Sequence, residues 1–267
     1  IEFEIELSDK STKWVLGSMN QSKTTGEYIL VVHDITQLRQ LNSMRRDFIS
    51  NLSHELRTPV SVIRANSETL LDGALESKKD AKVFAKAILH NSERLSDMVT
   101  DLIDLSRIEY GDLKLNIKKV DLKTFIDEFT LSIKSLTKKK DIEIINKSNH
   151  EEFVKADLQA LERIMNNLVD NALKYSEKGS SIVISTIKEN QHIKIMVSDN
   201  GIGISDEDKN HIFDRFYRTA SARASDKQGS GLGLAIVKNL TNSLNGEVGV
   251  DSKDPNGSIF WFTLPIS

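Results

Sequence analysis

The chain has 267 residues, of which 39% are hydrophobic and 28% are charged, and this is the composition of a globular protein long enough for two domains. Its formal net charge of -3 argues against a nucleic-acid-binding protein. The absence of cysteine excludes disulfides, thiol catalysis and thiolate zinc sites.

Residues 1–34 have the pattern of short β-strands. Phe3 and Ile5 alternate with acidic residues, and short apolar runs follow at residues 14–16 and 28–32. Three strands without a helix form a poor independent core, so we expect residues 1–35 to be the end of a truncated β-rich domain. The chain begins at Ile1 rather than Met, without a signal peptide or an apolar run of membrane-spanning length. We therefore expect a fragment whose preceding segments are missing.

Residues 36–110 have a helical pattern. Leu38, Leu41 and Leu52 fall on one apolar seam with the spacing of a coiled coil. The pattern breaks at residues 71–73, and a second helix with an unbroken apolar seam begins near Lys79. The region therefore predicts a hairpin of two long helices.

A single hairpin buries only one face of each helix, and Val99 and Ile103 widen the apolar face of the second helix. Two hairpins paired in a four-helix bundle would bury this surface, so we predict a homodimer. Asn91 is a polar residue in the seam, and such a residue can set the register of the helices. The alternative is an isolated hairpin that packs on its own C-terminal domain.

Residues 111–267 mix helical and strand patterns. Helices with one apolar face and strands with alternating apolar residues predict a two-layer α/β sandwich, and the whole chain is thus expected to be an α+β multidomain protein. The expected helices are residues 122–136, 158–175 and 232–244. The expected strands are residues 142–145, 181–187 and 192–198, with closing strands that contain Val248 and residues 260–262.

The segment "FISNLSHELRTPVSVI" (residues 48–63) contains a histidine in an amphipathic helix. His54 lies two residues from both Leu52 and Leu56, which rotates it by about 200° away from the apolar stripe. The segment alone would read as a helix with a solvated surface histidine.

The segment "NNLVDNALKYS" places polar groups on one face of a helix. Asn167 and Asn171 are four residues apart, and Lys174 follows on the next turn with Tyr175 beside it. Two amides and an ammonium on one face could hold a phosphate chain and a hydrated Mg²⁺. An ordinary polar helix face is the alternative.

The segment "SDNGIGIS" follows a predicted strand. Asp199 ends the strand, and Gly201 and Gly203 would let the backbone approach a flat ligand. A carboxylate here can accept a hydrogen bond from an exocyclic amino group such as that of adenine. A glycine-rich turn without a ligand is the alternative.

The segment "GSGLGLAIV" leads directly into a predicted helix. Gly229, Gly231 and Gly233 would expose backbone N–H groups and the helix N-terminus to an anion. The spacing fits neither the Walker motif nor the Rossmann fingerprint.

These motifs follow one another in an order that closely resembles the N, G1, F, G2 and G3 boxes of bacterial sensor histidine kinases, with "FDRFYR" (residues 213–218) as the F box and "NGSIF" (residues 256–260) as the G3 box. "SHELRTP" resembles the H box of the same family. The resemblance covers residues 36–267, and the sequence around the H box is similar to the phosphate-regulon sensors. "VVHDIT" resembles the exit of a PAS sensor domain.

The resemblance implies a PAS-like remnant in residues 1–35, a dimerisation and phosphotransfer hairpin in residues 36–110, and a GHKL (Bergerat) ATP-binding domain in residues 111–267. It implies that His54 accepts the phosphoryl group, that Asn171 binds Mg²⁺, and that Arg215 and Arg218 reach the γ-phosphate of ATP. The other nucleotide-binding positions that it implies are Asn167, Lys174, Tyr175, Asp199, Gly201, Gly203, Gly229, Gly231, Leu232, Gly233 and Leu234.

The family's chemistry also assigns roles beside the acceptor. Glu55 can accept a proton from the His54 ring or fix its tautomer, and Pro59 should kink the helix one turn beyond. Thr58 would orient water for dephosphorylation of the partner, which would be a response regulator, so we expect both kinase and phosphatase activity. The family further implies the cytoplasmic portion of a plasma-membrane protein, attached through segments missing from this chain.

Two other classes of function remain as alternatives. The related chaperone and topoisomerase ATPases carry a glutamate that activates water one turn before the Mg²⁺-binding asparagine, where this chain has Asn167. An amide cannot act as a general base, so hydrolysis of ATP by water is disfavoured. An inactive dimeric scaffold is the second alternative. Nothing supports it, because every residue of the motifs is present.

Overall fold

The computed structural model describes residues 2–6, 12–21, 26–109, 111–148, 152–224, 229–254 and 256–267. It divides into two compact units, Ile1–Thr58 and Pro59–Ser267. Helix α1 (Thr36–Leu71) begins in the first unit and ends in the second. None of the helices in the described ranges combines the length and apolar character needed to cross a membrane.

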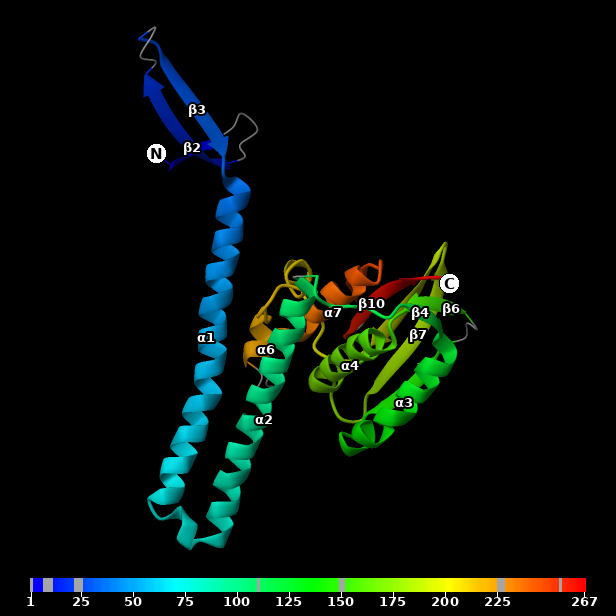
Figure 1. Ribbon diagram of the computed structural model, residues 1–267. Helices are drawn as coiled ribbons and strands as arrows, with labels where there is room; N and C mark the ends of the chain where they lie inside the picture. The colour runs from blue at the N-terminus through cyan, green and yellow to red at the C-terminus, as the bar shows by residue number, and fades with distance from the viewer. Residues whose placement is uncertain are drawn as a thin grey trace. The chain divides into compact units, whose positions relative to one another are not determined.

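The first unit contains an antiparallel sheet with the strand order β1-β2-β3 (Figure 1). The strands are β1 (Glu2–Glu6), β2 (Thr12–Gln21) and β3 (Tyr28–Asp34). The described residues of β3 are all exposed, and Val15 on β2 is buried. The three predicted strands are confirmed, and so little apolar surface is covered that the sheet has almost no core of its own.

The junction between β3 and α1 is a single residue, Ile35. Its N–H donates to the Trp14 carbonyl at 2.8 Å. The Thr36 hydroxyl accepts from the Trp14 N–H at 2.9 Å, and Asp34 Oδ1 accepts from the Thr36 N–H at 3.0 Å. The Arg39 guanidinium lies 4.4 Å from the centre of the Trp14 ring. Strand β2 thus fixes the first turn of the helix.

Helix α1 is followed by the short 3₁₀-helix η1 (Ala74–Glu76) and by α2 (Lys78–Glu109), which confirms the predicted break and second helix. Asn91 is buried, and its Nδ2 donates to the Ala87 carbonyl at 2.8 Å. Since this bond lies within α2, the role of Asn91 in helix register stays a prediction.

Helix α2 packs against α7 (Gly233–Ser243) of the C-terminal region. Packing of the hairpin on its own C-terminal domain was the alternative to a dimer. Val99 and Ile103 on α2 are nevertheless each 47% exposed, so the described part of the chain covers only about half of each side chain. The two arrangements therefore use different faces of α2, and the four-helix bundle stays a prediction.

The C-terminal region contains a five-stranded sheet with the order β5-β7-β8-β10-β9, in which only the β5–β7 pair is parallel among the described strands. Its strands are β5 (Glu143–Lys147), β7 (Ser181–Glu189), β8 (His192–Ser198), β9 (Val248–Ser252) and β10 (Ser258–Pro265). A second, two-stranded sheet pairs β4 (Lys118–Asp121) with β6 (Phe153–Ala156). These four-residue strands were not predicted, because their sequence shows no clear alternation.

Three helices cover one face of the five-stranded sheet: α3 (Leu122–Lys139), α4 (Leu158–Tyr175) and α7 (Figure 1). Alternate residues of the strands are buried beneath them, for example Ile182 and Ile184 on β7 and Ile193 and Ile195 on β8. The predicted two-layer sandwich is confirmed. The short helices α5 (Asp206–Lys209) and α6 (Ala220–Ala224) were not predicted, since neither has an apolar period.

We predict that Ile164→Ala lowers the free energy of unfolding by about 2–5 kcal/mol, because Ile164 is fully buried in the α4 face of the core and its loss leaves a cavity. Urea unfolding followed by Trp261 fluorescence in a Trp14→Phe background measures this change. The matched control is Leu131→Ala on α3, where the side chain is 72% exposed and about 0.5 kcal/mol or less is expected. Equal losses in the two variants would contradict the assignment of the core.

Candidate functional site

A cavity of about 620 Å³ lies within the unit Pro59–Ser267. Its wall comes from α2, from α4, from the segment that follows β8, from α6 and from the segment that leads into α7. Three of the motifs singled out in the sequence meet here, although up to 66 residues separate Asn167 from Gly233. The way each element is fixed explains why these side chains converge.

Helix α4 supplies one wall because its two faces have opposite character. Asp157 caps its start, since Oδ1 accepts from the Ala160 N–H at 2.9 Å and Oδ2 accepts from the Asn116 N–H at 2.7 Å. One face is buried on the sheet, and residues of the other face line the cavity at helical spacing. These residues are Arg163, Asn167, Asp170, Asn171, Lys174 and Tyr175.

Asp199 supplies an almost buried carboxylate, with 3% of the residue exposed. It follows β8, and its Oδ1 accepts from the N–H groups of Gly201 at 2.8 Å and of Ser258 at 3.2 Å. Burial raises the pKa of Asp199, while these two N–H groups and the charge of Lys253 act in the opposite direction. A carboxylate fixed in this way can accept a hydrogen bond from a ligand in the cavity.

Apolar side chains accompany Asp199 in the wall: Ile202, Ile204, Ile212 and Phe260. The cavity therefore combines flat apolar surface with one oriented acceptor. A planar heterocycle that carries an amino group has this chemistry.

The N-terminus of α7 supplies backbone donors. Its N-cap is Leu232, which makes no side-chain capping bond, and Gly233 and Leu234 of the first turn line the cavity. A Cβ atom on Gly233 would lie 2.7 Å from Asn167 Oδ1, so glycine is what lets α7 approach the polar face of α4 so closely. Together, the helix N-terminus and the amides of α4 form a suitable surface for an anion.

The segment of the predicted F box holds the loop before α7. The Phe216 N–H donates to the Gly231 carbonyl at 2.9 Å. Arg218 lines the cavity, and its Nη2 donates to the Ala222 carbonyl at 2.6 Å. Arg215 is exposed and is not part of the wall, so its predicted reach to a phosphate stays a prediction.

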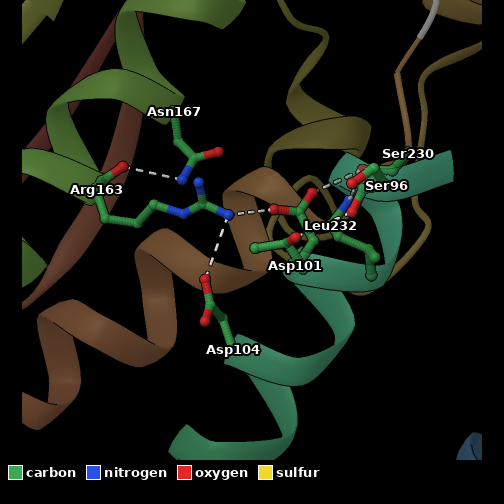
Figure 2. A network of polar contacts seen from close by, with 8 residues as sticks. Ser96, Asp101, Asp104, Arg163, Asn167, Ser230 and Leu232 are labelled. Atoms are coloured by element: carbon green, nitrogen blue, oxygen red, sulfur yellow. Dashed lines mark hydrogen bonds and ion pairs between the residues drawn. The ribbon is translucent and has the colours of Figure 1, made fainter. Parts of the chain in front are cut away.

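Helix α2 forms one side of the cavity, where a network of charged groups joins it to neighbouring elements (Figure 2). Arg163 Nη2 lies 2.5 Å from Asp101 Oδ1 and 3.4 Å from Asp104 Oδ2. The Ser230 hydroxyl donates to Asp101 Oδ2 at 3.4 Å. Burial raises the pKa of Asp101, and the positive charge of Arg163 partly offsets this rise. One carboxylate thus contacts both α4 and the loop that precedes α7.

The predicted nucleotide-binding residues divide into two groups. Gly201, Leu232 and Arg215 do not line the cavity: Gly201 is the buried donor to Asp199, and Leu232 is fully buried. The others line it, namely Asn167, Asn171, Lys174, Tyr175, Asp199, Gly203, Arg218, Gly229, Gly231, Gly233 and Leu234.

The H-box residues from Ser53 to Thr58 belong to the unit Ile1–Thr58, and Pro59 is the first residue of the second unit. His54 is exposed, as predicted for a group that must be reached by other molecules, and Thr58 is exposed on the following turn. The Thr58 hydroxyl donates to the His54 carbonyl at 3.3 Å. Glu55 is partly exposed beside them.

The sequence motifs did not identify the wall formed by α2 or its partner Arg163. Glu93, Asp97 and Asp101 line the cavity and are four residues apart, so they share one helix face. This spacing was visible in the sequence. Such spacing alone indicates only a charged helix face, because nothing local says what packs against it.

Two family profiles match successive parts of the chain. The first, "His Kinase A (phospho-acceptor) domain", covers residues 44–111. The second, "Histidine kinase-, DNA gyrase B-, and HSP90-like ATPase", covers residues 156–267. The chain belongs to the sensor histidine kinases.

Relatives of this histidine kinase agree with that assignment. Sensor-like histidine kinase SenX3 of Mycobacterium tuberculosis is 38% identical over 237 residues, which are 89% of this chain and 58% of SenX3. The chain thus spans little more than half of that relative's length. Among solved structures, the Acinetobacter baumannii histidine kinase AdeS has a TM-score of 0.64 at 28% identity, over 80% of this chain and 97% of AdeS. ShkA, solved full-length in complex with AMPPNP, has a TM-score of 0.61 at 26% identity, over 83% of this chain and 46% of ShkA.

We predict that Asp101 and Arg163 of this kinase are energetically coupled. In a double-mutant cycle with Asp101→Asn and Arg163→Met, we expect a coupling energy of about 1 kcal/mol, because the Arg163 side chain is 37% exposed and water screens the pair. Urea unfolding of the two single variants, the double variant and the wild type measures it. The matched cycle with Asp104→Asn should give a smaller value, since that contact is longer. A larger coupling for Asp104 would contradict this network.

Proposed function

We propose that this chain is the catalytic portion of a protein histidine kinase that binds ATP, phosphorylates itself on His54 and passes the phosphoryl group to an aspartate of a response regulator. The observation that carries the proposal is the cavity in which the N-box face of α4, Asp199 and the N-terminus of α7 meet. An exposed histidine in the matched phosphoacceptor profile supplies a group that can receive the phosphoryl group. We also propose that the hairpin forms a homodimer.

The chemistry of the cavity supports ATP as the nucleotide. Asp199 would accept a hydrogen bond from the adenine amino group, with the apolar side chains of the wall against the ring. Lys174, Asn167 and the N–H groups at the start of α7 would bind the phosphates. The matching profile is described as that of an ATPase, and the related ShkA was solved with AMPPNP.

The donor set also fits Mg²⁺. The described residues contain no group of three or more histidine, aspartate or glutamate side chains that could hold a metal by itself. Mg²⁺ is commonly held by one or two protein oxygens together with phosphates and water. Asn171 lines the cavity, and its amide oxygen would be that protein ligand. The ion would neutralise charge on the phosphates.

His54, rather than water, would accept the phosphoryl group. The position one turn before Asn171 is Asn167, whose amide cannot remove a proton from water. A nitrogen of the neutral His54 ring would attack the γ-phosphorus in line, the bond to the bridging oxygen would break, and ADP would leave with that oxygen. The proton of the ring would pass to Glu55. Arg218 would lie on the phosphate side of the cavity.

We expect His54→Gln to abolish autophosphorylation and to leave ATP binding unchanged, because His54 is not in the wall of the cavity. The measurement uses γ-labelled ATP with Mg²⁺ and tests whether the label on the wild type is lost in acid and retained in base. His33→Gln is the matched control, since His33 is also an exposed histidine. Acid-labile label retained by His54→Gln would sink the assignment of the acceptor.

We propose that Thr58 serves a second activity, the dephosphorylation of the response regulator. It lies one turn after His54, and its hydroxyl is exposed on the same helix. A hydroxyl at this position can orient a water molecule toward the aspartyl phosphate of a docked partner. The ring of His54 and Glu55 suffice for transfer, so the two activities would need different groups.

We expect Thr58→Ala to keep autophosphorylation and transfer largely intact and to slow dephosphorylation of the regulator by about 100-fold, the usual scale for loss of a positioned group. The measurement is the half-life of phosphorylated regulator mixed with each variant and ADP. Thr69→Ala is the matched control, because the exposed Thr69 hydroxyl donates to the carbonyl four residues earlier in the same way. If Thr58→Ala and the wild type shorten that half-life equally, Thr58 has no such role.

A further inference from the structure

The turn between β9 and β10 contacts the backbone of Asp199. Within the turn, the Lys253 N–H donates to the Gly257 carbonyl at 3.3 Å. The Lys253 side chain leaves the turn and binds the segment after β8: its Nζ donates to the Asp199 carbonyl at 3.1 Å and to Asn200 Oδ1 at 2.8 Å. One ammonium group therefore holds two consecutive residues of that segment.

The other end of the turn holds Asp199 as well. The Asp199 N–H donates to the Ser258 carbonyl at 2.9 Å, and the Ser258 N–H donates to Asp199 Oδ1 at 3.2 Å. Gly257 lies so close that a Cβ atom there would come within 2.2 Å of the Asp199 carbonyl oxygen. The backbone of Asp199 is thus hydrogen-bonded at both ends of the turn, to Lys253 and to Ser258. The bond from Ser258 also orients the carboxylate.

The positive charge of Lys253 also prepares Asp199 to accept a hydrogen bond, in addition to the hydrogen bonds that hold its backbone. Asp199 is 3% exposed, and burial raises the pKa of its carboxyl group. The positive charge of Lys253 opposes this rise and favours the ionised carboxylate. An ionised carboxylate is the better acceptor for an amino group. Lys253 is partly exposed and is not part of the cavity wall, so it would act through Asp199.

We propose that Lys253 is a positioning residue that sets the nucleotide base specificity of this kinase by fixing Asp199 toward the amino group of the bound purine. The inference rests on the proposed function, in which Asp199 reads adenine. Asp199 Oδ1 already accepts two backbone N–H groups, so Oδ2 is the oxygen that would face the base. Without Lys253, residues 199–200 lose two of the bonds that keep this oxygen in place.

The test compares two nucleotides that differ only in the amino group: ATP and purine riboside triphosphate, which carries hydrogen at position 6. In the wild type, ATP should bind more tightly. We expect Lys253→Met to weaken ATP binding by about tenfold, the scale of one hydrogen bond to a charged group, and to leave purine riboside triphosphate binding unchanged. Lys253→Arg, which keeps a charged donor, should restore much of the preference for ATP.

Controls separate this role from a loss of structure. Lys178→Met removes an exposed lysine outside the cavity and should change neither affinity. Equal weakening of both nucleotides by Lys253→Met would mean that Lys253 only stabilises the turn, and no weakening would mean that it has no role; either result overturns the proposal.

The wild type itself tests the basis of the proposal. If the wild type binds both nucleotides equally, Asp199 does not read the amino group, and the proposal fails together with that assignment. Autophosphorylation of the wild type with γ-labelled ATP is a separate test of the proposed kinase activity. If His54 is not labelled, the kinase assignment fails, and the comparison of the two nucleotides still tests Lys253 by itself.

Discussion

The site depends on one constraint, which is that a single helix must serve the core and the cavity at once. The apolar face of α4 is fully buried on the sheet, while its polar face carries Asn167, Asn171 and Lys174 into the cavity. The burial of side chains such as Ile164 and Leu168 fixes the rotation of the helix, and the Asp157 cap fixes where it begins. The polar residues cannot leave the cavity unless the core is disrupted.

Helices α7 and α2 both make specific contacts with the polar face of α4. Gly233 lets the N-terminus of α7 approach Asn167, and Arg163 on α4 binds Asp101 on α2. Asp101 in turn contacts Ser230 in the loop that leads into α7. A displacement of α2 would therefore affect both helices that are proposed to bind the phosphates, since one partly buried carboxylate has contacts toward each of them.

Much of the fold was predictable because the C-terminal elements have clear periods. The expected limits of α4, residues 158–175, are those of the structure, since both its apolar period and its capping residue are local features. The glycine-rich segment before α7 likewise indicated where this helix begins, because that segment is also a local feature. The resemblance supplied the roles that are proposed for His54 and Asp199, which spacing alone left as a surface histidine and a turn.

The rest depended on contacts between distant segments. Arg163 and Asp101 are 62 residues apart, and nothing near either residue indicates the other. Lys253 lies in a polar turn that could equally have been solvated, and only the pairing of β10 with β8 brings this turn to Asp199. Arg218 matched the motif and lines the cavity, and its bond to the Ala222 carbonyl is a contact that the motif does not specify. Arg215 matched the motif as well but is exposed.

The junction at Ile35 determines how mechanical force passes along the first unit. A flexible linker would absorb a twist of the sheet by rotating its own backbone bonds. Here a single residue separates β3 from α1, and Trp14 on the adjacent strand β2 is bonded to both Ile35 and Thr36. A torque applied to the strands must therefore rotate the first residues of α1 together with the strands.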